Sequence, residues 1–324
     1  MNLLFSCIGR REYIADFFRA ELSAGDTIIG TGNSPWTPGF VSCDEVVLLP
    51  DIDDPSYIDA VLEVCRAKRV DALLSFSDPD VHRLSRAVGE LTELGVVPLL
   101  PGPDVADIVF DKVRTCEFLV ANGYSTPRTW LDPNEVPSPV YPMFVKPRRG
   151  SGSTHTYLVN SDDQLRVLHG YAPDMIVQEA IIGEEINLEI CGDLAGKPVG
   201  VSLWRKYRSR LGETEQAETF REPSLIEFGL GLAERLGVVG PMDVDLIRRD
   251  GEVFVLEFNA RFGGGYPVSH LAGADFPKLL LSIVSTGIAT PNYDYRPGVV
   301  MMKRLDVIGG DSGRFFEELV RTPR

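Results

Sequence analysis

The first hundred residues alternate short apolar runs with amphipathic segments, and no other feature constrains the fold of this chain as strongly. The apolar runs predict buried strands, and the segments with apolar residues every three or four positions predict helices. Strands that alternate with helices through short connections form a parallel, doubly wound sheet. Residues 1–105 are therefore predicted to be a Rossmann-like α/β domain. We expect its strands at 2–7, 26–30, 46–49, 71–76 and 96–99, and its helices at 11–22, 57–68 and 80–94.

The turn after the first expected strand differs from the dinucleotide-binding pattern. It reads SCIGRR, residues 6–11, where that pattern has G-x-G-x-x-G. Without those glycines the backbone does not approach a pyrophosphate in the usual way, so an NAD-dependent oxidoreductase is disfavoured. The loop SFSDPD, 75–80, lies at the carboxyl end of a strand, where α/β sheets bind ligands. Its Asp78 and Asp80 are either substrate contacts or helix caps.

Beyond residue 105 the pattern changes. A helical segment at 106–122 leads to a crossing with five prolines between 127 and 142. Strands are expected at 143–146 and 176–178, and alternating residues at 186–191 and 198–207 predict an antiparallel sheet. Helices are expected at 224–236 and 276–285, and Asp250-Gly251 predicts a hairpin between strands 244–247 and 253–258. We divide the chain into 1–105, 106–183 and 184–324, an α/β domain followed by two α+β subdomains.

Composition excludes several classes of protein. The net charge of −15 argues against a broad nucleic-acid surface, which needs a basic face, but it leaves room for a local basic cleft. Five scattered cysteines without a CxxC pair predict reduced thiols and a cytoplasmic location. The four histidines show no zinc spacing, and no apolar run is long enough to span a membrane.

The segment VLEFNARFGGG, residues 255–265, carries the clearest chemical signal. Side chains alternate along a strand, so Glu257 and Asn259 face the same way, as does Arg261 if the strand persists. Carboxylate and amide oxygens suit a hard cation such as Mg²⁺, and the guanidinium suits a phosphate or a carboxylate. A strand that simply runs into a glycine-rich turn is the alternative.

Three further segments carry charge in patterns that suit a nucleotide. KPRRGSGS, 146–153, offers unhindered backbone amides beside cationic side chains, although it is not a Walker A loop and could be a surface loop. QEAIIGEE, 178–185, offers carboxylates that can accept ribose hydroxyls, or it is a solvated acidic turn. WRKYRSRLGETEQAET, 204–219, directs Lys206, Arg208 and Arg210 into one groove if it is a strand, and is otherwise an exposed loop.

Taken in chain order, these segments resemble the ATP-grasp superfamily. FDKVRT, VKPRRGSGS, QEAIIGEE, MDVDLI and LEFNARFGG follow the order of that family, and the resemblance extends from about residue 2 to residue 285. The chain looks most like stand-alone ATP-grasp proteins related to the large chain of carbamoyl-phosphate synthase. The resemblance implies that 106–183 and 184–324 are the small and large ATP-grasp subdomains.

The resemblance also implies a role for each matching residue. The two lysines of the first motifs would contact the phosphates, the loop 148–153 would fold over them, Glu179 would lie at the adenine and Glu185 would bind the ribose. The Mg²⁺ ligands, with Mn²⁺ as a substitute, would be Asp245, Glu257 and Asn259, with Asp243 as the rival of Asp245. The catalytic cations would be Arg261, Arg208 and Arg210. The ATP-binding set would be Lys112, Lys146, Arg149, Gly150, Ser151, Gly152, Ser153, Gln178, Glu179, Ala180, Ile181, Glu185 and Lys206.

The implied activity is that of an ATP-dependent carboxylate–amine ligase. A small-molecule carboxylate would be phosphorylated by ATP, and an amine or ammonia would then displace phosphate to give an amide or peptide bond. A kinase-like enzyme that releases an acyl-phosphate or carbamoyl-phosphate, and a non-catalytic ATP-binding module, are the alternatives. The sequence names neither substrate, and a homodimer is one of the assemblies open to the chain.

Overall fold

The computed structural model describes residues 1–150, 152, 154–210 and 213–310. Three sheets organise these residues: a five-stranded sheet of order β3-β2-β1-β4-β5, a four-stranded sheet of order β6-β9-β7-β8, and a six-stranded sheet of order β14-β13-β10-β11-β12-β15. Each sheet falls within one of the three predicted domain ranges, whose boundaries stay a prediction. The strands are β1 Asn2–Ser6, β2 Thr27–Gly32, β3 Glu45–Leu48, β4 Ala72–Ser75, β5 Val97–Pro98, β6 Thr129–Trp130, β7 Met143–Pro147, β8 Tyr157–Val159, β9 Met175–Glu179, β10 Glu184–Gly192, β11 Pro198–Arg210, β12 Glu213–Phe220, β13 Gly240–Arg249, β14 Glu252–Asn259 and β15 Val300–Met302.

Ten α-helices and three short 3₁₀ helices accompany these strands in the described part of the chain. The α-helices are α1 Glu12–Glu21, α2 Tyr57–Lys68, α3 Asp78–Leu84, α4 Val88–Glu93, α5 Pro103–Phe110, α6 Lys112–Ala121, α7 Asp162–His169, α8 Pro223–Leu236, α9 Tyr266–Leu271 and α10 Phe276–Thr286. The 3₁₀ helices are η1 Pro38–Ser42, η2 Ser85–Ala87 and η3 Pro133–Glu135.

The N-terminal sheet is parallel, as the alternation of strands and helices predicts. Its central strand β1 is buried along most of its length, because helices cover both faces of a parallel sheet. The prediction of one helix at 80–94 is wrong in detail. The helical segment begins at Asp78, where Pro79 suits the first turn, and η2 divides it into α3 and α4.

The helix expected at 106–122 is two helices, α5 and α6, which meet at Asp111. Asp111 has extended backbone, and its side chain accepts hydrogen bonds from the amides of Val113 and Arg114. It is therefore the N-cap of α6, and this cap ends one helix and starts the next. The break sets the direction of α6, whose first residue is Lys112.

The six-stranded sheet is antiparallel and its two faces differ. One face carries apolar side chains such as Leu188, Leu203 and Val244, and α8 packs beside β10 and β11. The other face carries Asn187, Asp245 and neighbouring polar residues. Alternation along each strand produces this division, because successive side chains point to opposite faces.

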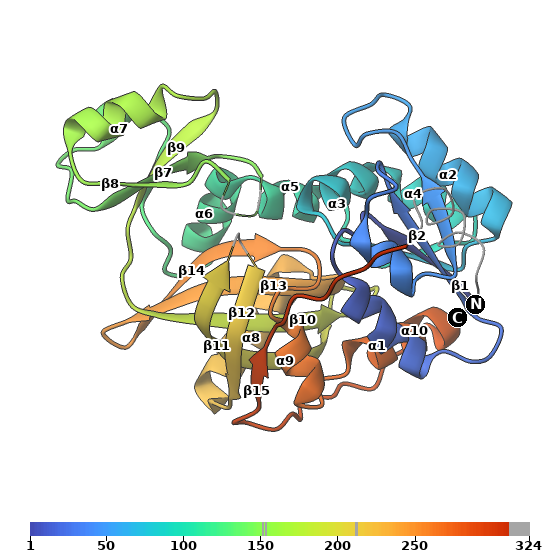
Figure 1. Ribbon diagram of the computed structural model, residues 1–324. Helices are drawn as coiled ribbons and strands as arrows, with labels where there is room; N and C mark the ends of the chain where they lie inside the picture. Colours follow the sequence, from blue (N-terminus) through green and yellow to red (C-terminus); the bar gives the residue numbers. More distant parts are fainter. Residues whose placement is uncertain (151, 153, 211–212, 311–324) are drawn as a thin grey trace.

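Figure 1 shows how the parts are arranged. The small sheet with α7 forms a separate lobe, α5 and α6 connect it to the N-terminal domain, and the six-stranded sheet lies below them. The segment after β15 runs back towards the N-terminal domain, where Lys303 Nζ contacts the hydroxyl of Tyr13 at 3.2 Å. The predicted fold class, a Rossmann-like domain followed by two α+β parts, is confirmed. No helix in the described ranges is long and apolar enough to cross a membrane.

Candidate active site

A row of acidic and amide side chains lies on the polar face of the six-stranded sheet. We call Asp243, Asp245, Glu257 and Asn259 the acidic row. Asp243 pairs in register with Asn259, and Asp245 pairs with Glu257, so these four side chains share one face of the β13–β14 hairpin. Asn187 on β10 donates to Asp243 Oδ1 at 2.8 Å and to Asp245 Oδ1 at 2.9 Å. The predicted cation ligands are therefore brought together, with the rival Asp243 beside them.

A β-bulge in β14 changes what this row presents. The register shifts after Asp245, which pairs with Glu257, because Leu246 pairs with Val255 and leaves Leu256 as an extra residue. Both Leu256 and Glu257 consequently line the same cleft, although consecutive residues of a regular strand face opposite ways. The bulge thus places an apolar side chain and a carboxylate next to one another.

The two aspartates of β13 have different electrostatic surroundings. Burial alone would raise the pKa of Asp245, but the charge of Lys206, whose Nζ lies 2.8 Å from Asp245 Oδ1, lowers it. Burial, followed by repulsion from Asp245, raises the pKa of Asp243. Asp245 is therefore held ionised, and Asp243 is the member of the pair that binds a proton more readily.

Arg261 connects this face to the N-terminal domain. Its Nε donates to Asp78 Oδ2 at 3.1 Å, its Nη2 donates to Asn259 Oδ1 at 3.0 Å, and its Nη1 donates to the carbonyl of Phe262. Burial works against the charge, but Asp78 and Asp243 outweigh it and raise the pKa of Arg261. The guanidinium is therefore a fixed positive charge next to the acidic row.

The three glycines after Arg261 are packed against acidic and aromatic side chains. A Cβ at Gly263 would lie 2.3 Å from Glu189 Oε1, and a Cβ at Gly265 would lie 2.2 Å from the Trp204 ring. Gly264 is similarly close to Glu213 Oε2, at 2.7 Å. Any side chain here would collide with its neighbours, so the loop keeps its backbone pressed against the sheet.

A second group of cations approaches from the small lobe. Lys112 Nζ donates to the carbonyl of Gly150 at 2.8 Å and lies 3.7 Å from Glu257 Oε2. Desolvation lowers the pKa of Lys146, and the nearby charge of Glu257 offsets part of this effect. Lys112 and Lys146 therefore stand on the side of the cleft that faces the acidic row.

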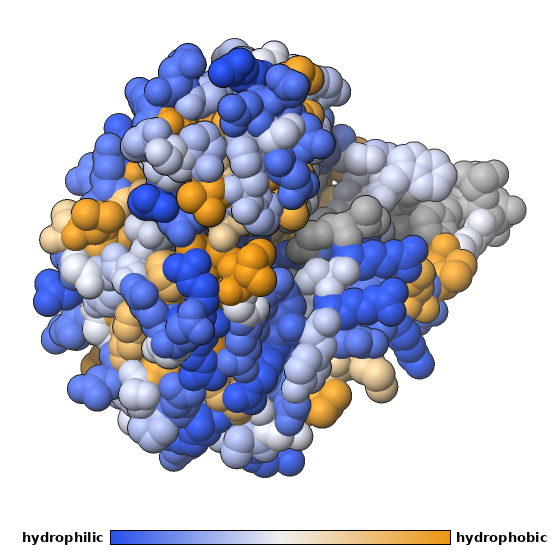
Figure 2. Space-filling model, turned by 90° about the vertical axis from the view of Figure 1, so that its left-hand side faces the viewer, coloured by the Kyte–Doolittle hydropathy of each residue, from blue (hydrophilic) through white to orange (hydrophobic). Residues whose placement is uncertain are grey.

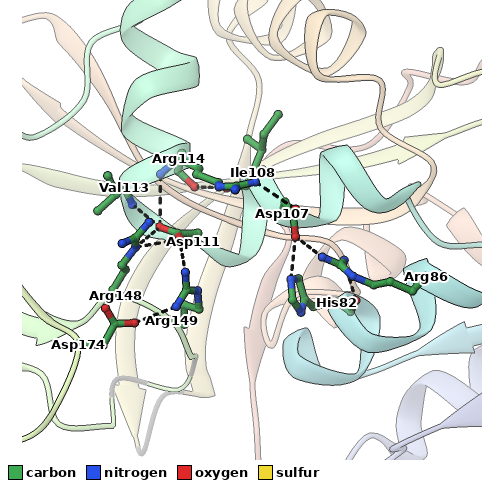
Figure 3. A network of polar contacts seen from close by, with 11 residues as sticks. His82, Arg86, Asp107, Ile108, Asp111, Val113, Arg114, Arg148, Arg149 and Asp174 are labelled. Atoms are coloured by element: carbon green, nitrogen blue, oxygen red, sulfur yellow. Dashed lines mark hydrogen bonds and ion pairs between the residues drawn. The ribbon is translucent and has the colours of Figure 1, made fainter. Parts of the chain in front are cut away.

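Asp111 holds the start of the glycine-rich loop in place. Its carboxylate accepts from Arg148 Nε at 2.8 Å and from Arg149 Nη2 at 2.9 Å, as Figure 3 shows. Burial would raise the pKa of Asp111, but its hydrogen bonds, led by that from Arg148, lower it. The same buried carboxylate thus caps α6 and fixes the loop, so the position of Lys112 and that of Gly150 depend on one residue.

The acidic row, Arg261 and the two lysines line one cleft of about 990 Å³ between the small lobe and the six-stranded sheet. Figure 2 shows the hollow between the small lobe and the rest of the molecule, viewed from the side of the small lobe. A space of this size accommodates a nucleotide together with a second small molecule. The predicted residues that line it are Lys112, Lys146, Arg149, Gly150, Gly152, Ile181, Glu185, Lys206, Arg208, Asp245, Glu257, Asn259 and Arg261. Ser151 and Ser153 lie outside the described residues.

Four predicted residues are not brought to the cleft. Glu179 forms ion pairs away from the cleft, with its Oε2 3.1 Å from Arg128 Nε and its Oε1 3.9 Å from Arg249 Nη1. Gln178 is buried and donates a hydrogen bond to the hydroxyl of Thr129. Ala180 is likewise not among the residues that line the cleft. Arg210 is exposed and lies 3.9 Å from Glu215. Bulges in β11 on either side of Arg208 interrupt the period of two, so Lys206 and Arg208 line the cleft and Arg210 does not.

The structure also connects charged residues that lie outside the predicted ATP-binding, metal-binding and catalytic sets. Arg11 donates to Glu213 Oε1 at 2.9 Å and to the carbonyl of Phe262, and Lys303 donates to Glu213 Oε2 at 2.8 Å. Burial alone would raise the pKa of Glu213, but the charges of Arg11 and Lys303 lower it to about 2. Asn187 and Glu189 could in principle be found from the sequence, because they alternate with the apolar residues Ile186, Leu188 and Ile190.

Two family models match this chain. Residues 3–99 match the model of the PylC-like N-terminal domain, and residues 109–265 match the model of the ATP-grasp domain. Residues 109–265 form an ATP-grasp domain. The cleft, with Lys112, Lys146 and the acidic row on β13 and β14, is contained mostly in this domain.

Proteins similar in sequence to this chain include ligases. The chain is 27% identical over 296 residues to the 3-methyl-D-ornithine–L-lysine ligase of Methanosarcina barkeri, covering 85% of this chain and 76% of that protein. It is 26% identical over 274 residues to the carbamoyl phosphate synthase large chain of Myxococcus xanthus, covering 74% of this chain and only 25% of that one. Among solved structures, the L-amino acid ligase of Bacillus licheniformis has a TM-score of 0.69 at 21% identity, covering 91% of this chain and 77% of that chain. The predicted ATP-grasp domain and the resemblance to the synthase large chain are confirmed.

Proposed function

We propose that this protein is an ATP-dependent ligase that joins a small-molecule carboxylate to an amine and releases ADP and phosphate. The observation that carries the proposal is that cationic and acidic side chains face each other across one cleft. Lys112 and Lys146 approach from the small lobe, while Asp245 and Glu257 face them from the large sheet. Such a pair of walls suits the phosphates of ATP on one side and a cation that bridges them on the other.

The donor set fits a magnesium ion that is shared with a nucleotide. Asp245, Glu257 and Asn259 offer the hard oxygen atoms that Mg²⁺ prefers, and Asp245 and Glu257 are half-buried beside the cleft. Within the described ranges no group of three or more His, Cys, Asp or Glu side chains could hold a metal by itself. This matches Mg²⁺, which is commonly held by one or two carboxylates plus substrate phosphates. When bound, it would neutralise charge on the transferred phosphoryl group.

The residues of the chain would position the reactants and neutralise charge. A substrate carboxylate oxygen attacks the γ-phosphorus of ATP, ADP leaves, and an acyl-phosphate results. The amine nitrogen then attacks the acyl carbon, the carbon–oxygen bond to phosphate breaks, and the nitrogen loses a proton. Arg261 stands beside the acidic row, where it would bind the anionic end of the carboxylate substrate or its phosphate. The sequence of events requires no enzyme nucleophile, because ATP activates the carboxylate.

The substrates are proposed to be amino acids or similarly small carboxylates and amines. The methanogen relative joins a modified ornithine to lysine, according to its name. The end of this cleft near Gly264 has Arg11, whose guanidinium suits the carboxylate of such a substrate.

A matrix of amino acids taken in pairs, each with ATP and Mg²⁺, tests the proposal. ADP release that requires both partners, with a condensed product in the mass spectrum, is the expected result. ADP release with a carboxylate alone and a stable acyl-phosphate would assign the kinase-like alternative instead. ATP binding without turnover across the whole matrix, and across simple carboxylates with ammonia, would contradict the ligase.

A further inference from the structure

Behind one end of the cleft, a glutamate is shared by two cations from distant parts of the chain. Glu213, the first residue of β12, accepts from Arg11 Nη2 at 2.9 Å through Oε1 and from Lys303 Nζ at 2.8 Å through Oε2. Arg11 directly precedes α1, and Lys303 directly follows β15. Of the three, only Arg11 is among the described residues that line the cleft. Glu213 and Lys303 therefore reach a molecule in the cleft through Arg11.

Arg11 keeps hydrogen-bond donors for a ligand. Its Nη1 donates to the carbonyl of Phe262 at 2.6 Å and its Nη2 donates to Glu213, so in the described part of the chain these two contacts occupy two of its five N–H groups. The carbonyl of Phe262 also accepts from Arg261 Nη1 at 3.0 Å. This common acceptor places Arg11 beside the cation that we propose to hold the reacting carboxylate or its phosphate. A guanidinium with free donors at such a place suits a second carboxylate.

Lys303 prevents Glu213 from taking up the remaining donors of Arg11. An arginine and a free carboxylate commonly form a pair in which both oxygens accept from the guanidinium. Here Lys303 occupies Oε2, so Glu213 accepts from Arg11 through Oε1 alone. Burial would raise the pKa of Glu213, but the charges of Arg11 and Lys303 lower it to about 2, so the carboxylate stays ionised and keeps both bonds. The orientation of Arg11 thus depends on a residue outside the cleft.

Two further contacts hold Lys303 in place. Its backbone amide donates to the carbonyl of Glu215 at 2.9 Å, which continues the pairing of β15 with β12. Its Nζ donates to the hydroxyl of Tyr13 at 3.2 Å and lies 4.8 Å from the centre of that ring. Lys303 lies beyond both ranges that match family models, 3–99 and 109–265, so neither model describes its contacts.

From these contacts we infer that Lys303 and Glu213 are positioning residues for a carboxylate subsite on Arg11. The subsite holds a substrate carboxylate other than the one that is phosphorylated, and Lys303 sets the affinity of the subsite from outside the cleft. The inference rests on the proposed function for the kind of molecule that the cleft binds. Its test measures binding and not turnover, so its failure is separate from a failure of the ligase assay.

Calorimetric titration of the full chain with ADP and Mg²⁺ tests the subsite, with the standard amino acids and their α-carboxamides as probes. We expect at least one amino acid to bind at one site per chain and its amide to bind about tenfold more weakly, because the amide lacks the charge that Arg11 attracts. Lys303→Met frees Oε2 for Arg11 and should weaken binding of the amino acid about tenfold without weakening that of the amide. Lys303→Arg restores the charge and the donor, so it should recover most of the affinity.

Two further variants separate positioning from simple loss of charge. Arg304→Met removes a positive charge from the exposed neighbour of Lys303, and it should leave binding within about twofold of wild type. In a Glu213→Gln background Lys303→Met should lose most of its effect, because the carboxylate that competes for Arg11 is absent. An undiminished effect in that background would overturn the role of Glu213. Equal affinity of wild type and Lys303→Met, or no amino acid that binds in preference to its amide, would overturn the subsite.

Discussion

The parallel sheet of the N-terminal domain and the antiparallel sheet of the ATP-grasp domain place their polar groups in different ways. Strand β1 of the parallel sheet has the apolar residues Leu3, Leu4 and Phe5 at its centre, and buried polar groups such as Ser6 and Ser75 stand at the strand ends. The antiparallel sheet instead carries its acids along the strands, on one face, as Asp243 and Asp245 do. Helices cover both faces of the first sheet. On the second sheet α8 packs on one face, while α9 and α10 cover part of the other, where Ser202 donates to Ser269 and Trp204 packs against Val268.

This difference teaches where each sheet can hold a ligand. A sheet covered completely on both sides offers only its edge, whereas a sheet with one face partly uncovered offers that open part, with a side chain at every second position. The cleft joins the two arrangements, since Arg261 on the antiparallel side contacts Asp78 at the end of a parallel strand. Substitutions that separate these contributions test the comparison.

The largest effect is expected from Glu257→Gln, which alters the polar face alone. The amide keeps the shape but loses the charge that faces Lys112 and that would hold the cation. ATP turnover should fall by at least about 100-fold, with an unchanged melting temperature. Glu252→Gln, on the same strand at the hairpin end, is the control. Equal turnover by Glu257→Gln and wild type would contradict the proposed role of Glu257 as a metal ligand.

Arg261→Lys tests the junction between the two sheets. Lysine keeps one charge but cannot contact Asp78 and Asn259 with the same planar fork, so turnover should fall by roughly 30-fold. Steady-state kinetics measure the effect, and Arg235→Lys on the exposed side of α8 is the control. A loss of less than about threefold would show that a point charge suffices.

Asp111→Asn tests the small-lobe wall of the cleft. Asparagine still caps α6, so stability should change little, but Arg148 and Arg149 lose their charged anchor. The KM for ATP should rise by roughly five- to tenfold while kcat changes less. Asp107→Asn, in the neighbouring network of His82 and Arg86 shown in Figure 3, is the matched control and should leave this KM unchanged. If Asp111→Asn and Asp107→Asn have the same KM for ATP, the Asp111 carboxylate does not contribute to nucleotide binding.

Glu213 provides a test by pH, because it joins α1's domain to the ATP-grasp domain through Arg11. Its pKa in the folded protein, about 2, lies below its ordinary value of 4.5, so its stabilising contribution is present above pH 4.5 and is lost as the pH falls towards 2. Chemical unfolding should show wild type losing about 1–3 kcal/mol more than Glu213→Gln across this range. The exposed Glu227→Gln should follow wild type. Parallel curves for wild type and Glu213→Gln would contradict the assignment of this ion pair.

The smallest effect separates two neighbouring arginines. Arg208 lines the cleft and Arg210 does not, so Arg208→Ala should reduce turnover about threefold and Arg210→Ala should leave it within the error of the assay. Both side chains are exposed and both contact Glu215, which makes each the control of the other. A larger loss in Arg210→Ala would reverse the placement given by the bulges in β11.

Much of this arrangement could be predicted from local pattern. The strands of the parallel sheet and the polar positions of VLEFNARFGGG follow from periodicity, which depends on burial of one face or the other. The break at Asp111 could not be read in this way, because a single cap interrupts a continuous apolar period. The turn of Glu179 towards Arg128 and Arg249 depends on side chains distant in sequence. The extra residue Leu256 likewise arises from pairing with β13, and pairing is not a local property.

The loop Gly263–Gly265 has a consequence for how this protein can acquire new substrates. Gly263 is pressed against Glu189 and Asp243, and Gly265 is pressed against the Trp204 ring, so a mutation that adds a side chain at either position is penalised. One wall of the cleft is in this way closed to gradual change. Divergence in specificity is instead expected in the adjoining loops around Arg11 and Asp78, whose contacts are made by side chains and can be exchanged one at a time.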